Sequence, residues 1–188
     1  MENIKIINDD LKRALDDEEN FSSCVFESCD FTNCNLTGKE FRECVFDRCN
    51  LALCKLANAT LIDIEFTHSK LVGSDFSAVR KPAFSQPFIL FDDCLVDLCN
   101  FSGLPMKGAK FDGCTVRNCT FGQTNLSQAS FDRTDLEGTT FHHADLTKAD
   151  FSSAKNYAID PTANTLKKTR FSLPEAVSLL RGFDIELV

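Results

Sequence analysis

Several residue types are scarce in this chain of 188 residues, and each scarcity excludes a class of protein. There is no tryptophan and only one tyrosine, against 18 phenylalanines. No apolar run approaches the length of about 18 residues that a membrane-spanning helix needs. The eight glycines are scattered, so no glycine-rich loop could cradle a phosphate. The sequence therefore argues against a membrane-spanning protein and against a nucleotide-binding enzyme.

Basic residues are also in the minority. The chain has 20 Lys and Arg against 28 Asp and Glu, a formal net charge of −8. Because such a chain is repelled by the nucleic-acid backbone, we expect no nucleic-acid partner. The first residues, from Met1 to Lys5, lack the basic and apolar regions of a signal peptide. We therefore expect a cytoplasmic protein without a membrane partner.

What the sequence does contain is a repeat of five residues. A large apolar residue recurs at every fifth position from Phe21 to Phe76 and from Phe91 to Phe151, and these 25 positions hold 14 of the 18 phenylalanines. The position two residues earlier is Cys, Ala, Ser or Thr in 20 of the 25 repeats. The exceptions are Glu19, Lys39, Ile64, Ile89 and Leu104.

A period of five fits neither the 3.6 residues of an α-helix nor the 2.0 residues of a strand. We predict a chain that turns regularly and points one large and one small residue of every five inward. Such units cannot bury their apolar side chains alone, so they must stack into a solenoid.

All ten cysteines fall at the small inward position. They are Cys24, Cys29, Cys34, Cys44, Cys49, Cys54, Cys94, Cys99, Cys114 and Cys119. Their spacing of five differs from the Cys-x2–4-Cys pairs of common zinc sites, and no histidine lies at a matching spacing. We interpret them as small buried side chains and expect no disulfides, since nothing indicates an oxidising compartment. A ladder of thiols that holds a metal or acts in redox chemistry is the alternative.

No catalytic grouping is evident. The three histidines, His68, His142 and His143, fall at outward positions, and inward Cys and Ser side chains lack an activating base. A filled solenoid core also leaves no cavity for a substrate. We expect neither an enzyme nor a bound cofactor or metal.

Individual repeats resemble those of a known family. Residues 144–148 (ADLTK) and 149–153 (ADFSS) are similar to the A(D/N)LXX unit of pentapeptide-repeat proteins, and residues 34–38 and 124–128 fit the same pattern. The resemblance covers residues 21–78 and 91–153. It implies an all-β fold, a right-handed quadrilateral β-helix with four pentapeptides per coil, so that residues twenty apart stack.

The length, the interrupted repeat and the C-terminal segment resemble most the branch of the family that protects DNA gyrase, which includes quinolone-resistance proteins and a microcin immunity protein. This resemblance implies an acidic rod that mimics DNA, binds DNA gyrase or topoisomerase IV, and forms a homodimer through its C-terminal segment. The alternative is an interaction scaffold with an unrelated protein partner.

The repeat is flanked by two other segments. Residues 1–20 could form a helix or a degenerate first coil. In residues 154–188, Ser172 and Glu175 form a capping box with an early Pro174 that predicts a helix start, and Gly182 suits the residue past its end. Residues 183–187 alternate like a strand. This C-terminal helix caps one chain or pairs with a second copy, and the residues expected at that interface are Val177, Leu179, Leu180, Phe183 and Ile185.

The repeat breaks at residues 79–90, where the expected centres are Lys81 and Gln86. We interpret this stretch as an excursion worth two pentapeptides. It could fold back onto the solenoid or project as a recognition loop, because binding residues concentrate on loops that a rigid scaffold holds. The candidate contacts on it are Arg80, Lys81, Phe84 and Phe88.

Removing two pentapeptides places Phe91 on the face that begins at Phe21. Outward carboxylates then concentrate on two adjoining faces with net charges of −5 and −4. The first of these faces is expected to carry Glu40, Glu43, Asp63, Asp92, Asp93, Asp112, Asp132 and Asp150. The second is expected to carry Glu27, Asp47, Glu65, Asp97, Asp135 and Glu137. These carboxylates are the candidate contacts for a basic groove on the partner.

Overall fold

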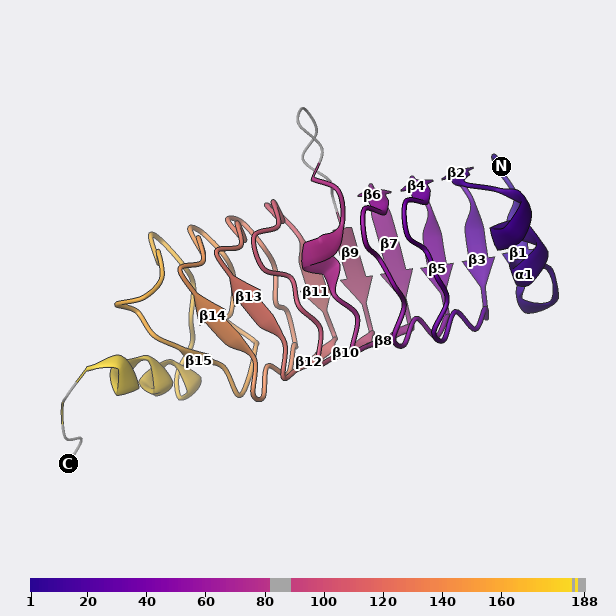
Figure 1. Cartoon of the computed structure of the whole chain (residues 1–188). Helices are drawn as coiled ribbons and strands as arrows, with labels where there is room; N and C mark the ends of the chain where they lie inside the picture. Colours follow the sequence, from indigo (N-terminus) through magenta and orange to yellow (C-terminus); the bar gives the residue numbers. More distant parts are fainter. Residues whose placement is uncertain (82–88, 184, 186–188) are drawn as a thin grey trace.

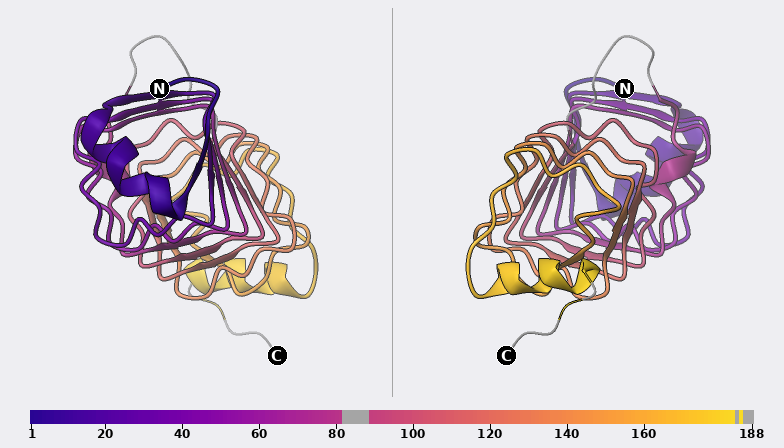
Figure 2. Two further views of the ribbon diagram at one scale, coloured as in Figure 1. Left: turned by 90° about the vertical axis from the view of Figure 1, so that its right-hand side faces the viewer. Right: turned by 90° about the vertical axis from the view of Figure 1, so that its left-hand side faces the viewer.

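The chain winds into a rod. The computed structural model describes residues 1–81, 89–183 and 185. They form a parallel β-solenoid of about 7 turns (Figure 1). Seen along the axis, each coil has four sides (Figure 2), which confirms the predicted quadrilateral β-helix. Within the described ranges, no helix is both long and apolar enough to cross a membrane.

Short parallel strands line the sides of the rod. The six-stranded sheet contains, in order, β1 (Lys5–Ile7), β3 (Val25–Glu27), β5 (Val45–Asp47), β7 (Ile64–Thr67), β9 (Ile89–Asp92) and β11 (Lys110–Asp112). One three-stranded sheet contains β2 (Asn20–Ser22), β4 (Glu40–Arg42) and β6 (Thr60–Ile62). Another contains β8 (Lys70–Val72), β10 (Leu95–Asp97) and β12 (Thr115–Arg117), and a third contains β13 (Thr120–Gly122), β14 (Thr140–His142) and β15 (Ala158–Ile159). A short 3-10 helix, η1 (Phe76–Ala78), precedes the interruption of the repeat.

The corners of each coil explain the period of five. The residue two places after most large centres, though not after Phe76 or Phe151, adopts the left-handed conformation, for example φ 51° at Ser23, 53° at Ser28 and 59° at Asn33. Such a residue turns the chain from one side of the coil to the next. Because most side chains disfavour this conformation, Asn, Gly and other small or polar residues suit the corner best.

We number the four faces of the rod in the order in which the chain meets them. The first face is centred on Phe21, Phe41, Leu61, Met106, Leu126, Leu146 and Leu166. The second face is centred on Phe26, Phe46, Phe66, Phe91, Phe111, Phe131, Phe151 and Phe171. The third is centred on Phe31, Leu51, Leu71, Val96, Val116 and Leu136. The fourth is centred on Leu36, Leu56, Phe76, Phe101, Phe121 and Phe141.

The core is a set of stacked side-chain columns. On the second face, the phenylalanine rings stack with centroid separations of 4.5–5.5 Å from Phe26 to Phe171. Rings of the second and fourth faces meet edge to face, as Phe91 and Phe101 do at 6.0 Å. Both geometries are favourable for aromatic pairs, so the column adds to the free energy gained by burial alone.

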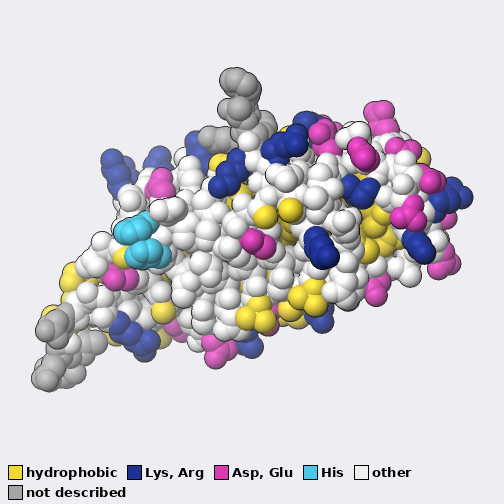
Figure 3. All heavy atoms as spheres, viewed as in Figure 1, with side chains coloured by type: hydrophobic (Ala, Val, Ile, Leu, Met, Phe, Trp, Pro, Cys, Tyr) yellow, Lys and Arg dark blue, Asp and Glu magenta, His cyan; other side chains and the backbone are white. Residues whose placement is uncertain are grey.

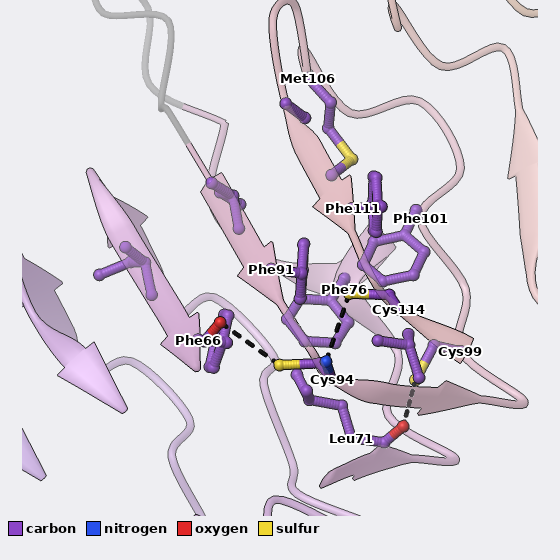
Figure 4. Close-up of a cluster of buried hydrophobic side chains, with 14 of the residues drawn as sticks. Phe66, Leu71, Phe76, Phe91, Cys94, Cys99, Phe101, Met106, Phe111 and Cys114 are labelled. Atoms are coloured by element: carbon purple, nitrogen blue, oxygen red, sulfur yellow. Dashed lines mark hydrogen bonds between the residues drawn. The ribbon is translucent and has the colours of Figure 1, made fainter. Parts of the chain in front are cut away.

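The cysteines lie in the core and also form hydrogen bonds between coils. Nine of the ten are buried, Cys34 is half-buried, and all ten are free thiols. The Cys94 thiol donates to the Phe66 carbonyl of the previous coil at 3.3 Å (Figure 4) and lies at the same distance from the Asp92 carbonyl. At the equivalent position, the Ser69 hydroxyl donates to the Phe46 and Thr67 carbonyls at 2.9 Å. The small position therefore holds residues that fit the core and also bridge adjacent coils, which the interpretation as small apolar side chains did not include.

The interruption shifts the register by one pentapeptide and not by two. β7 pairs with β9, with Phe66 opposite Phe91, and Phe76 stacks on Phe101 at 4.8 Å. Partners here are 25 residues apart, where the regular spacing is 20. The prediction that Phe91 continues the face of Phe21 is therefore wrong.

The reason is that the chain begins a further first-face side before it leaves the rod. The Arg80 N–H donates to the Ala59 carbonyl at 2.8 Å, as the Thr60 N–H donates to the Lys39 carbonyl one coil earlier. The next residue, Lys81, is exposed, although its place in the repeat is a core centre. Ile89 and Leu90, which we had assigned to the excursion, belong to β9. Residues 82–88 lie outside the described part of the chain.

Large residues replace small ones beside this interruption. Ile64, Ile89 and Leu104 all occupy the small inward position and are buried. Ile89 and Leu104, with Leu61 and Met106, line a residual cavity of about 10 Å³. Ile89 and Leu104 fill the space that the missing first-face centre would have occupied, which explains two of the five exceptions to the repeat, and Ile64 lies opposite Ile89 in the β7–β9 pair.

The N-terminal segment supplies both of the structures that the sequence left open. β1 forms the first rung of the second face, since Lys5–Ile7 pairs with Val25–Glu27. The α-helix α1 (Asn8–Asp17) then crosses the open end of the rod (Figure 2) and buries Leu11 and Ala14. The N-terminal end of the core is therefore covered.

The position of Lys39 explains a further exception to the repeat. Its ammonium group donates to the carbonyls of Leu15 at 2.6 Å and Glu18 at 2.8 Å, at the C-terminal end of α1. A cation at this end of a helix satisfies free carbonyls and matches the helix dipole. Lys39 thus ties the cap to the second coil.

The C-terminal segment forms a 3-10 helix, η2 (Glu175–Gly182), at the other end of the rod (Figure 1). The predicted capping box is wrong, because the Ser172 hydroxyl donates to the Ser152 carbonyl and no side chain caps η2. Gly182 is the last residue of the helix and not the one after it. Phe183 and Ile185 are not in a strand, and the rest of the predicted strand lies outside the described residues.

Candidate interaction surfaces

The second face carries the largest surplus of negative charge. Between Val25 and Ser153 it presents eight carboxylates and three basic side chains, a net of −5. The carboxylates are those of Glu27, Asp47, Glu65, Asp92, Asp93, Asp112, Asp132 and Asp150. The parallel strands align five of them, Glu27, Asp47, Asp92, Asp112 and Asp132, in one column along the rod, with Thr67 between Asp47 and Asp92. Glu65 and Asp150 precede their centres, and Asp93 lies at a corner of the coil.

The adjoining third face is less acidic. Its outward carboxylates are Asp30, Asp97, Asp135 and Glu137, and its bases are Lys70 and Arg117, a net of −2 over residues 30–138. The structure therefore places the acidic surplus on the second and third faces, whereas we expected it from the sequence on the faces that begin at Phe21 and Phe26. Glu40, Glu43 and Asp63 were expected beside Asp92, and the structure places them on the first face, because the register shift is five residues.

Ion pairs divide the second face into three parts. Near the N-terminal end, Glu27 pairs with Lys5 at 2.5 Å and with Arg48 at 2.7 Å. The hydrogen bond from Lys5 lowers the pKa of Glu27. Toward the C-terminal end, Arg133 pairs with Asp132 at 3.0 Å.

The central carboxylates have no such partners. Glu65, Asp92, Asp93 and Asp112 make no ion pair within the described ranges. Asp92 and Asp93 are exposed, and Asp112 accepts a hydrogen bond from the Ser130 hydroxyl at 2.6 Å. We call these four carboxylates the central acidic patch. It lies on the strands that flank the interruption of the repeat, β7, β9 and β11.

The carboxylates of the third face serve the structure as well. Asp135 is buried and accepts from Asn156 at 2.7 Å and from Arg117 at 2.5 Å. Burial alone would raise the pKa of Asp135, but these two hydrogen bonds lower it below the usual value. Glu137 shares Arg117 at 3.4 Å. Asp135 is therefore a poor candidate for direct contact with a partner.

The candidate loop contacts are only partly described. Arg80 and Lys81 are exposed at the edge of the first face. Phe84 and Phe88 lie outside the described residues.

The C-terminal end presents an open apolar groove. Pro174, Val177, Leu180, Phe183 and Ile185 line about 570 Å³ beside η2. Val177, Phe183 and Ile185 are 43%, 48% and 55% exposed, whereas Leu179 packs against the core. Four of the five predicted interface residues therefore face this groove, and Leu179 does not line it.

A family model for pentapeptide repeats matches residues 20–61, 49–80 and 117–152, in 8 copies of the unit. These segments cover more than half of the chain. The chain is a pentapeptide-repeat protein. This agrees with the resemblance of its ADLTK and ADFSS units.

The chain also aligns with solved structures of other proteins. QnrB1, a plasmid-mediated fluoroquinolone resistance protein, aligns over 98% of this chain and 97% of its own, with a TM-score of 0.51 and 15% identity. HetL, from the cyanobacterium Nostoc and involved in the regulation of heterocyst differentiation, aligns over 89% of this chain and 95% of its own, with a TM-score of 0.42 and 15% identity. No curated protein sequence matches the chain significantly.

Proposed function

We propose that this pentapeptide-repeat protein binds the DNA-binding surface of a type II topoisomerase, DNA gyrase or topoisomerase IV, and protects the enzyme from inhibitors or toxins. The observation that carries the proposal is the acidic second face, with eight carboxylates distributed along one side of the rod. The full-length structural likeness to QnrB1, a fluoroquinolone resistance protein, supports it at the level of the fold.

The charge density sets the strength of the mimicry. Duplex DNA carries one charge per about 1.7 Å, which is about three charges over the spacing of about 4.8 Å between neighbouring strands. The second face offers about one carboxylate per coil. It is therefore a diluted copy of DNA, sufficient to guide the rod toward a basic groove, with the central acidic patch as the contact.

A supercoiling assay tests the proposal. Purified gyrase is assayed with a fluoroquinolone and increasing amounts of the protein, and the formation of cleaved DNA is measured in parallel. We expect the protein to restore supercoiling or to inhibit it directly at higher concentration. A protein that neither protects nor inhibits gyrase or topoisomerase IV would overturn the proposal.

A matched pair of variants locates the surface. Glu65→Gln, Asp92→Asn and Asp93→Asn together neutralise the centre of the second face. Glu2→Gln, Asp16→Asn and Asp17→Asn remove the same charge from exposed positions near the N-terminal cap. We expect at least a tenfold loss of protection in the first variant and little change in the second, and equal losses would show that only the net charge matters.

Replacing both Phe84 and Phe88 by Ala tests the candidate loop contacts. We expect this variant to bind the partner more weakly without a lower thermal transition temperature.

We also propose that the apolar groove beside η2 pairs with a second copy of the chain. Exposed Val177, Phe183 and Ile185 lie at the end of the rod, where two copies can meet end to end. Light scattering should give a dimer mass for the natural chain and a monomer mass for Val177→Asp with Phe183→Asp. If the natural chain is a monomer, these residues only cap the C-terminal end of the rod and the dimer proposal is wrong.

A second candidate function, a scaffold for an unrelated protein, is favoured by one feature of the third face. Leu53 and Leu98 are 54% and 60% exposed and adopt φ values of 57° and 55°. Both the exposure and the backbone conformation disfavour leucine at a corner. Binding of an apolar partner would explain them. If Leu53→Asn with Leu98→Asn abolished binding to a partner while gyrase protection was absent, the scaffold function would be the correct one.

A further inference from the structure

The first face changes the sign of its charge halfway along the rod. Before the interruption its outward side chains include Glu40, Glu43 and Asp63 against Arg42. From the interruption onward they include six bases, Arg80, Lys81, Lys107, Lys148, Lys167 and Lys168, against the single carboxylate of Asp145. We call these six residues the basic row. In Figure 3, Lys and Arg side chains lie along the upper edge on the C-terminal side.

The basic row lacks counter-charges. All six side chains are exposed, and none makes an ion pair with a residue that the structure describes. On the acidic faces, by contrast, Arg48, Arg117 and Arg133 each pair with a carboxylate. The one carboxylate among the six bases, Asp145, accepts from the backbone N–H of Thr147 at 2.9 Å. The positive charges of the basic row are therefore directed to solvent.

The other outward residues of this half of the face indicate what kind of anion fits. They are Pro105, Gly108, Asn125, Ser127, Gln128, Thr147 and Thr165. Among these described residues, none has a large apolar side chain that could enter a bilayer, and none has an aromatic ring on which unpaired bases could stack. Arginine, lysine, asparagine, glutamine, serine and threonine are among the residues that contact the phosphates of duplex DNA.

The geometry suits a duplex that lies along the rod. Pro105, Asn125, Asp145 and Thr165 are in register on successive coils, so the row runs parallel to the axis. At about 4.8 Å per coil, the four coils from Lys81 to Lys168 span about 19 Å along the axis. This is little more than half of one turn of the double helix, which is about 34 Å.

We infer that the C-terminal half of the first face binds the phosphate backbone of duplex DNA without sequence preference. This goes beyond the proposed function, because it uses a different face and needs no topoisomerase. The net charge of −8 weakens long-range attraction of the whole chain to DNA. It does not prevent contact at a face where six bases meet one carboxylate. The binding is therefore weak and strongly dependent on salt.

The test measures binding of a fluorescent 30-base-pair duplex by anisotropy at a series of salt concentrations from about 25 mM. One variant carries Lys107→Gln, Lys148→Gln, Lys167→Gln and Lys168→Gln. The matched control carries Lys12→Gln, Arg13→Gln, Lys55→Gln and Lys70→Gln, which removes the same charge from other exposed positions without recorded ion pairs. Thermal unfolding of each protein is recorded in parallel, and exposed positions should leave it unchanged.

We expect the natural chain to bind with a slope of log K against log salt of about −5, as six phosphate contacts predict. The first variant should lose at least tenfold in affinity at the lowest salt and show a slope of log K against log salt of about −2. The control should bind nearly as well as the natural chain. Absence of binding by the natural chain, or equal losses in both variants, would overturn the inference.

Two further outcomes would assign the row to another partner. Binding to anionic lipid vesicles but not to DNA would overturn the inference in favour of a membrane. The inference would also be overturned if the natural chain bound no DNA but self-associated at low salt and the row variant did not. The partner of the basic row would then be the acidic face of a second copy. Direct binding of the protein to gyrase, measured without DNA, separates this inference from the proposed function. The variant with the four lysine replacements should still bind gyrase.

Discussion

Phe66 and Phe91 stack with ring centroids 5.2 Å apart, although a segment that breaks the repeat separates them in the sequence. Their pairing joins β7 to β9 and so fixes how the two halves of the rod are aligned (Figure 4). This alignment puts Glu65 on the same face as Asp92, Asp93 and Asp112, with Glu65 opposite Leu90 and Thr67 opposite Asp92, and so groups the central acidic patch.

Truncation of Phe91 should be among the most destabilising changes in the core. Phe91 is 1% exposed and contacts the rings of Phe66, Phe101 and Phe111. Phe91→Ala should lower the free energy of unfolding by about 3–5 kcal/mol, and Phe91→Leu by about 1–1.5 kcal/mol, because leucine is accepted at many other centres. Chemical denaturation measures both. Similar losses in the two variants would show that ring stacking, and not volume, dominates at this position.

Removal of the Lys39 ammonium should loosen the N-terminal cap. Lys39→Met keeps the length of the side chain but removes both hydrogen bonds to the C-terminal carbonyls of α1, and should cost about 1–2 kcal/mol. Hydrogen exchange at the Glu18 amide, which donates to the Ala14 carbonyl, should accelerate. Lys12→Met, an exposed position on the same helix, is the control. Unchanged exchange in Lys39→Met would show that Leu11 and Ala14 hold the cap without it.

The buried thiols should make the protein sensitive to alkali. Burial raises the pKa of Cys44 to about 11 and that of Cys54 to about 12. In the unfolded chain a thiol titrates near about 8.5, so above that pH the unfolded state binds fewer protons than the folded state. The stabilisation is complete below about pH 8.5 and is lost as the pH rises toward 11, by about 1.4 kcal/mol per pH unit for each thiol.

Serine at positions 44 and 54 should remove the contribution of these two thiols to the loss of stability at alkaline pH. Ser69 and Ser74 occupy equivalent positions and make the same bonds between coils, so Cys44→Ser with Cys54→Ser should fold. The fall in unfolding free energy between pH 8.5 and 10.5, from denaturation series, should be shallower in this variant. Parallel curves for the two proteins would contradict the assignment to these thiols.

Replacement of Leu98 should stabilise the protein. Asn118, one coil further along the same corner, adopts φ 50°, so asparagine is compatible with this position. Leu98→Asn should raise the free energy of unfolding by about 0.5–1 kcal/mol, since it relieves an unfavourable conformation and removes an exposed apolar side chain. Leu53→Asn should gain less, because the Leu53 side chain lies over Gly73. A loss of stability in Leu98→Asn would show that the leucine packs usefully within the monomer.

The repeat allowed the fold to be predicted, and the same repeat concealed the alignment of its two halves. A period of five determines which residues face inward, and it assigned the core positions of Phe21 to Phe151 and of the ten thiols correctly. An excursion of five or of ten residues leaves that phase unchanged, so periodicity cannot show which face Phe91 joins. Backbone pairing decides it, through the Arg80 N–H and the Ala59 carbonyl.

For the candidate surfaces, too, the period of the repeat predicted which side chains face outward but not which of them share a face. Outward exposure of the carboxylates was predictable from phase alone, whereas the grouping of Glu65 with Asp92 and Asp93 depended on the register. The two ends were harder still. Lys39 looked like a defect in the repeat, because its partners, the carbonyls of Leu15 and Glu18, belong to a helix that the periodic pattern does not include.

The N-terminal cap also bears on how the molecule is made. Everything that closes this end lies in the first 47 residues: β1, α1, the paired strands β3 and β5, and Lys39. Each later coil contacts the one before it, about twenty residues back in the sequence. As the ribosome releases the chain, a closed end can therefore exist before the rest is synthesised, and successive coils can add to it in order.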